Sequence, residues 1–169
     1  MPTLFFLIDM DKIHFDCDYM AGAHPEIMRR LSETNLLKTP GYGYDDYTRS
    51  AEKLILDMCG LKRGRVHFLV GGTQTNATVI DGLLHQYEGV IGTEFGHVNV
   101  HESGAIEASG HKVLALPAHD GKLNSKELKQ YISDFYRDDT WQHMVQPGMV
   151  YISHPTELGT LYSLKELED

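Results

Sequence analysis

Residues 66–70 (Val-His-Phe-Leu-Val) constrain the fold most, because this short apolar run leads directly into Gly71 and Gly72. A brief apolar run that ends at glycine is typical of a buried β-strand. The residues that follow, from Thr73 to about Gln86, are spaced as in a helix. The sequence therefore predicts a tight strand-to-helix turn, the repeating unit of an α/β layer fold.

The same alternation continues on both sides of this turn, and it predicts an α/β fold with a mostly parallel sheet and flanking helices. Ligands of such sheets usually bind at the carboxyl ends of the strands. Ser163 opens a last helix that stops after barely a turn and a half, so we expect the sequence to be truncated within its fold. The predicted helices are 24–35, 46–61, 73–86, 97–109 and 124–136, and the predicted strands are 66–70, 89–92, 112–116 and 149–153.

The length of 169 residues suits a single domain. The chain has 15 basic and 24 acidic residues, a net charge of −9, and no basic run, which argues against nucleic acid as a partner. No apolar run approaches the roughly 20 residues that span a bilayer, so we expect no membrane association. Two cysteines form no disulfide framework or metal motif, and the chain reads as cytoplasmic.

The turn at residues 71–76 (Gly-Gly-Thr-Gln-Thr-Asn) has the chemistry of a phosphate site. Its glycines allow close approach to the backbone, and a helix N-terminus presents N–H groups and a positive dipole end. Neither the P-loop pattern nor the dinucleotide pattern GxGxxG is present. Two interpretations stay open: a phosphate site, or simply a tight turn.

Three other features have less specific chemistry. His97 and His101 would share one helix face, but no third ligand stands at a suitable spacing, so we predict no metal site. His97 could instead present its ring to a planar ligand. The Gly- and Tyr-rich residues 40–46 suit either a surface turn or a ligand rim. Cys17 lies between two aspartates whose charge disfavours a thiolate, so it is not expected to be a nucleophile.

The order of residues 14–19, 42–46, 71–76 and 96–97 resembles the N-terminal half of the low-specificity threonine aldolases. These enzymes belong to the β-eliminating lyase group, depend on pyridoxal phosphate and have the aspartate-aminotransferase fold, fold type I. The resemblance implies that residues 13–169 form the N-terminal part of a cofactor-binding large domain. Residues 1–12 would then be a possible N-terminal extension, with Met10 as an alternative start.

The resemblance also implies roles for individual residues. Gly72 and Thr73 match positions that hold the cofactor phosphate, and His97 matches the histidine that stacks on the cofactor ring. Cys17 stands where many relatives have a serine near the substrate carboxylate. Tyr42 matches a tyrosine that reaches the active site of a neighbouring subunit, which implies a homo-oligomer, either a dimer or a tetramer.

Glu102 matches an acidic position near the site, and the resemblance assigns it no role. The implied reaction cleaves a β-hydroxy amino acid, threonine or allo-threonine, to glycine and an aldehyde. In relatives the Schiff-base lysine, an aspartate and an arginine of the site lie in the second half of the chain, and none is present here. We therefore expect the 169 residues alone to be inactive.

Three alternatives stay open. The chain is a non-catalytic remnant or fragment with residual phosphate binding, a β-eliminating amino-acid lyase of the same family, or an unrelated phosphate-binding α/β module.

Overall fold

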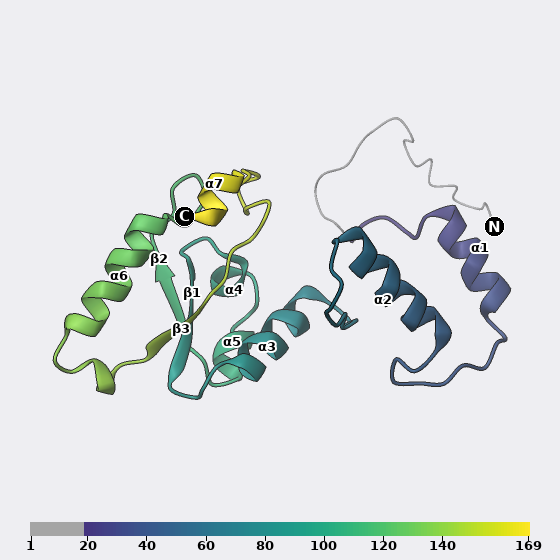
Figure 1. Cartoon of the computed structure of the whole chain (residues 1–169), viewed down its shortest axis with the longest axis horizontal. Coiled ribbons are helices and arrows are strands. Elements are labelled where there is room, and N and C mark those ends of the chain that lie inside the picture. Colours follow the sequence, from purple (N-terminus) through teal and green to yellow (C-terminus); the bar gives the residue numbers. More distant parts are fainter. Residues whose placement is uncertain (1–18) are drawn as a thin grey trace, which may run out of the picture. The chain divides into compact units, whose positions relative to one another are not determined.

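The computed structural model describes residues 19–169. The predicted extension at residues 1–12 and the predicted site residue Cys17 lie outside the described residues. The chain divides into two compact units, Met1–Val66 and His67–Asp169, and each is described by itself (Figure 1). None of the helices among residues 19–169 is long and apolar enough to cross a membrane.

The first unit contains the two helices that apolar spacing predicts, α1 (Pro25–Thr34) and α2 (Asp46–Met58). Their ends follow from local chemistry. The side chain of Asp45 accepts a hydrogen bond from the Thr48 N–H at 2.8 Å and so caps α2. Gly60, at φ 66°, takes the left-handed conformation that ends this helix.

The apolar stripes of these two helices are open to solvent. No residue of α1 or α2 is buried. The described part of the first unit therefore builds no hydrophobic core of its own. The exposed apolar side chains on the two helices include Ile27, Met28, Leu31, Leu54 and Met58.

The second unit is built on a three-stranded parallel sheet with the order β2-β1-β3. The central strand β1 (Glu88–Thr93) pairs with β2 (Val113–Leu116) and β3 (Gln146–Val150). All but the first residue of β1 are buried, as expected for a parallel strand that is covered on both faces. The predicted parallel sheet with flanking helices is confirmed.

Helices cover both faces of this sheet (Figure 1). The buried residues form two clusters, because successive side chains of a strand point to opposite faces. On one face Val90 packs with Ile80 of α3 (Gly72–Leu83), Val98 of α4 (His97–Val100) and Ile106 of α5 (Ala105–Ala108). On the other face Ile91, Leu114 and Leu116 pack against Leu128, Tyr131 and Ile132 of α6 (Ser125–Arg137).

Two sequence predictions are wrong. Residues 66–70 do not form a strand in the structure, and Phe68 and Val70 are exposed. The three-stranded sheet of the described residues does not include this segment, and a strand without a ladder partner has no backbone hydrogen bonds to hold it. The single helix predicted at 97–109 is two short helices, because Ser103 (φ 52°) and Gly104 (φ 74°) are left-handed.

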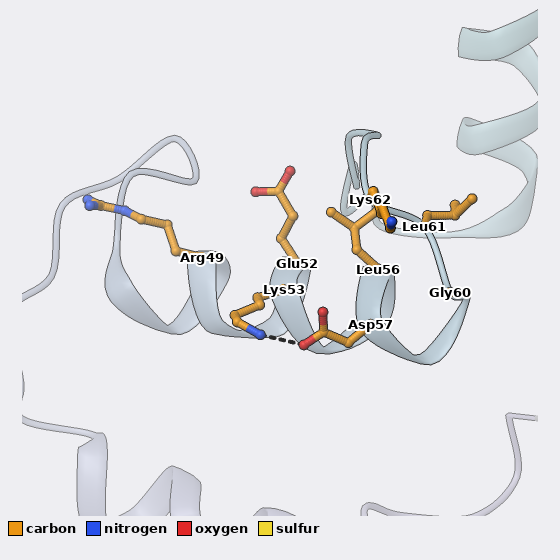
Figure 2. Close-up of a pocket in the computed structure, with 8 residues that line it drawn as sticks. All are labelled: Arg49, Glu52, Lys53, Leu56, Asp57, Gly60, Leu61 and Lys62. Atoms are coloured by element: carbon orange, nitrogen blue, oxygen red, sulfur yellow. Dashed lines mark hydrogen bonds and ion pairs between the residues drawn. The ribbon is translucent and has the colours of Figure 1, made fainter.

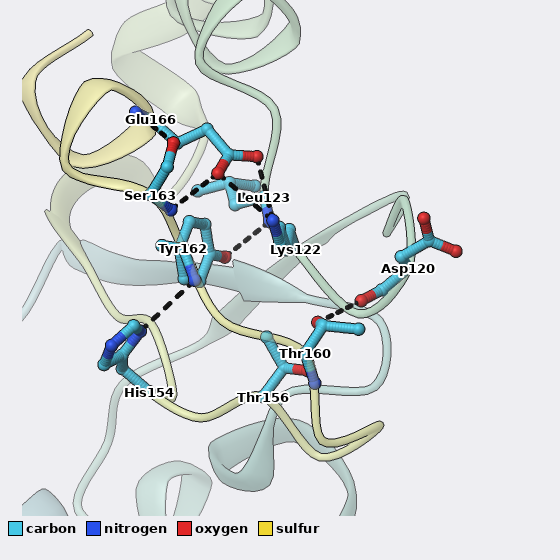
Figure 3. Close-up of polar contacts among 9 residues, drawn as sticks. All are labelled: Asp120, Lys122, Leu123, His154, Thr156, Thr160, Tyr162, Ser163 and Glu166. Atoms are coloured by element: carbon cyan, nitrogen blue, oxygen red, sulfur yellow. Dashed lines mark hydrogen bonds and ion pairs between the residues drawn. The ribbon is translucent and has the colours of Figure 1, made fainter.

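The segment after β3 is bound back onto the turn that follows β2 (Figure 3). The hydroxyl of Tyr162 accepts a hydrogen bond from the Leu123 N–H at 2.7 Å, and the Thr160 hydroxyl donates to the Asp120 carbonyl at 2.6 Å. The 3-10 helix η1 (Trp141–His143) precedes β3, and the last helix is α7 (Leu164–Glu168). Ser163 and Glu166 form a capping box at the start of α7, which explains why so short a helix is present.

Candidate functional site

The N-terminus of α3 is open. Its N-cap residue, Gly71, is extended and provides no side-chain hydrogen bond, and the first turn contains no acidic residue. A Cβ atom placed on Gly71 or Gly72 would meet no atom within 4 Å. Thr73, in the same turn, is exposed. The first backbone N–H groups of a helix lack partners within the helix, so this end of α3 suits an anion.

His97 lies at the carboxyl end of the sheet, four residues after the end of β1. Its side chain is 44% exposed, and its ring Nδ1 lies 2.8 Å from Oε1 of Glu102. The Glu102 side chain is fully buried. The same oxygen accepts a second hydrogen bond, at 2.6 Å, from Nδ2 of Asn76 on α3. A chain of hydrogen bonds therefore joins the half-exposed ring to the helix that carries Gly72 and Thr73.

A second carboxylate, that of Glu157, holds the backbone of His97. The backbone N–H of His97 donates to Oε1 of Glu157 at 2.7 Å, and the hydroxyl of Ser153 donates to the same oxygen. Ser153 and Glu157 follow β3, so they lie at the same sheet edge as the end of β1. Sequence reasoning did not single out Ser153 and Glu157, although polar residues at the end of a predicted strand and just after it were a usable signal.

An open pocket in the first unit is not part of this arrangement. It lies along α2 and carries charges of both signs, including the ion pair between Lys53 and Asp57 (Figure 2). None of the predicted site residues within the described part of the chain lines it. Its lining residues are Arg49, Glu52, Lys53, Leu56, Asp57, Gly60, Leu61 and Lys62.

Comparison with known families decides the relationship of this chain. Residues 15–169 match the sequence model of the beta-eliminating lyase family. The chain belongs to the beta-eliminating lyase family. The match extends over both units and includes the α3 turn and His97.

Two curated proteins similar to this chain are low specificity L-threonine aldolases. The protein from Pseudomonas sp. is 30% identical over 160 residues, and that from Pseudomonas aeruginosa is 30% identical over 156 residues. Each alignment covers 91% of this chain and 44% of the relative. The chain thus spans less than half the length of the curated relatives that it matches.

A solved structure shares the fold. The threonine aldolase of Leishmania major superposes with a TM-score of 0.84 and 42% sequence identity, over 90% of this chain and 43% of that one. The expected fold type I is therefore confirmed for the part of the fold that this chain contains.

Other residues singled out from the sequence lie elsewhere or make different contacts. Tyr42 belongs to the first unit, has a left-handed backbone (φ 62°) and is fully exposed. The His101 ring lies 5.6 Å from the His97 ring, centroid to centroid. The carboxylate of Glu102 forms its hydrogen bond with the ring Nδ1 of His97. Within residues 19–169 no group of three or more His, Cys, Asp or Glu side chains is arranged to hold a metal ion.

Proposed function

We propose that this chain carries the phosphate and ring contacts of a pyridoxal-phosphate-dependent lyase that cleaves threonine or allo-threonine to glycine and an aldehyde. One observation carries the proposal: an open helix N-terminus and a half-exposed histidine ring occur in the same unit and are linked through Glu102 and Asn76. The threonine aldolase names of the relatives favour aldol cleavage over the β-elimination of the family description.

The described residues fit the cofactor at both of its ends. The open first turn of α3, with the backbone of Gly72 and the hydroxyl of Thr73, would bind the phosphate, and the helix dipole favours its negative charge. The exposed face of His97 would contact the pyridine ring. When bound, pyridoxal phosphate supplies the electron sink for the pair released as the Cα–Cβ bond of the substrate breaks. The residues of this chain would bind the cofactor and orient it.

Two further contacts remain predictions from the resemblance. Cys17, outside the described residues, would lie near the substrate carboxylate. Tyr42 would reach the site of a second subunit, so we propose that the full-length protein assembles as a homo-oligomer. Its exposure in the present structure is compatible with such a contact. A small amino-acid substrate and a cytoplasmic location complete this proposal.

We propose that the 169 residues by themselves bind the cofactor phosphate but do not catalyse the cleavage reaction. The chain covers 44% of the length of its curated relatives, and the resemblance assigns the cofactor-linking lysine to the part of the relatives that is not covered. Residual binding of the cofactor phosphate is therefore the activity proposed for the isolated chain.

Binding of pyridoxine 5′-phosphate tests this proposal. This analogue lacks the aldehyde, so it cannot label surface lysines. We expect the amide NMR signals of Gly72 and Thr73 to shift on titration, and Thr73→Ala to weaken binding. Thr78→Ala, at an exposed position of the same helix, is the matched control and should leave binding unchanged. Equal affinities of the two variants would contradict a phosphate contact at Thr73.

A further inference from the structure

Glu102 joins the two elements that the proposed function assigns to opposite ends of the cofactor. Its Oε1 accepts hydrogen bonds from Asn76 and from the His97 ring, at 2.6 and 2.8 Å. Asn76 lies one turn along α3 from Gly72 and Thr73. The carboxylate is therefore a buried bridge between the helix end and the ring.

The chemistry of this bridge determines the tautomer of His97. An ionised carboxylate only accepts hydrogen bonds, so the ring nitrogen that faces it, Nδ1, must carry the proton. In the neutral ring, Nε2 is then left without a proton. The Glu157 carboxylate fixes the backbone of the same residue, so His97 is held at its N–H and at its ring.

The burial of Glu102 needs an explanation beyond packing. Its side chain is fully buried, and Oε2 has no hydrogen-bond partner among the described residues. Burying a carboxylate with incomplete hydrogen bonding costs free energy, whereas an apolar side chain of similar size would fill the same space without that cost. A role that requires an acceptor-only group accounts for a carboxylate at this position.

We propose that Glu102 is a positioning residue of the cofactor site. It holds His97 in the Nδ1–H tautomer and, through Asn76, fixes the ring relative to the N-terminus of α3. Its importance for the cofactor rests on the proposed function. The effect on the tautomer does not, because the contacts exist in the chain without any ligand.

The first experiment measures the tautomer directly, on the full chain without ligand. Long-range ¹H–¹⁵N NMR of histidine-labelled protein distinguishes protonated from bare ring nitrogens, and the signals lost in His97→Gln identify His97. We expect the wild-type ring to be protonated at Nδ1. In Glu102→Gln the amide can donate as well as accept, so we expect a mixture of tautomers. Glu107→Gln, at an exposed position on α5, is the matched control and should keep the wild-type signals.

The second experiment compares two ligands. Inorganic phosphate needs only the α3 end, whereas pyridoxine 5′-phosphate also needs the ring of His97. We expect Glu102→Gln to weaken pyridoxine 5′-phosphate about tenfold, the effect of disturbing one charge-assisted hydrogen bond, and to leave phosphate affinity unchanged. If this variant does not fold, Asn76→Ala replaces it. That variant should keep the tautomer and still weaken pyridoxine 5′-phosphate selectively.

The outcomes separate this inference from the proposed function. A wild-type His97 protonated at Nε2, or an unchanged tautomer in Glu102→Gln, would overturn the role of Glu102. So would equal losses of affinity for both ligands. If the wild-type chain does not bind pyridoxine 5′-phosphate, the proposed function fails, while the tautomer measurement still decides whether Glu102 positions His97.

Discussion

The ammonium of Lys122 lies 3.0 Å from the carboxylate of Glu166, which is 44 residues later in the chain (Figure 3). Lys122 follows β2 and Glu166 lies on α7, so the pair holds the last helix of the described chain against the turn at His119–Gly121. Lys122 also lies 5.7 Å from the ring centroid of Tyr162, which adds a cation–π contact.

Protonation of Glu166 should weaken this attachment at low pH. Hydrogen bonds from the Ser163 backbone N–H, the Lys122 ammonium and the Ser163 hydroxyl lower the pKa of Glu166 from 4.5 to about 2. A carboxyl with a lowered folded-state pKa stabilises the fold above its unfolded pKa, and this contribution is lost as the pH falls toward about 2. We expect Glu166→Gln to flatten the fall in melting temperature between about pH 4.5 and pH 2. Glu168→Gln, exposed on the same helix, should leave that slope unchanged.

Gly89 is required by the close approach of β1 and β2. A Cβ atom at this position would lie 2.6 Å from the carbonyl oxygen of Lys112, which accepts the hydrogen bond of the Val90 N–H. We expect Gly89→Ala to lower the free energy of unfolding by about 3 kcal/mol, as measured by urea denaturation. Gly82→Ala in α3 is the matched control. A Cβ there meets nothing within 4 Å, so this change should stabilise the fold by about 1 kcal/mol.

His111 acts as a structural histidine before β2. It is 3% exposed, and its Nδ1 lies 2.9 Å from the Glu88 carbonyl oxygen at the start of β1. We expect His111→Leu to destabilise the fold by about 1–3 kcal/mol, because the part-buried carbonyl of Glu88 loses its donor. His143→Leu, at an exposed position, should change the urea midpoint little. Similar midpoints for the two variants would contradict this role of His111.

An aldehyde assay tests whether the isolated chain lacks catalytic activity. We expect the 169-residue polypeptide, mixed with pyridoxal phosphate and allo-threonine, to release no acetaldehyde above the rate of the cofactor alone. The full-length Leishmania major threonine aldolase, whose fold it shares in part, is the positive control. Acetaldehyde production that depends on the polypeptide would disprove this prediction.

Helix positions were largely predictable because their signals are local. Local sequence patterns predicted α1, α2 and α6, and the side chain of Asn124 caps the start of α6. The residues of the candidate site were only partly predictable. Gly72, Thr73 and His97 carry recognisable chemistry, whereas Asn76 and Glu157 gain theirs from contacts with residues 26 and 60 positions away in the chain.

The sequence by itself determined most of the helices, the alternation that produces a parallel sheet, and the family. These depend on residue spacing, on caps and on the order of motifs. Only the tertiary structure decided that residues 66–70 are not a strand and that residues 97–109 are interrupted at Ser103 and Gly104. A strand requires a partner that lies elsewhere in the chain. Glu102, before this interruption, contacts Nδ1 of His97, and Ile106, after it, packs in the core. Both contacts join groups that only the folded chain brings together.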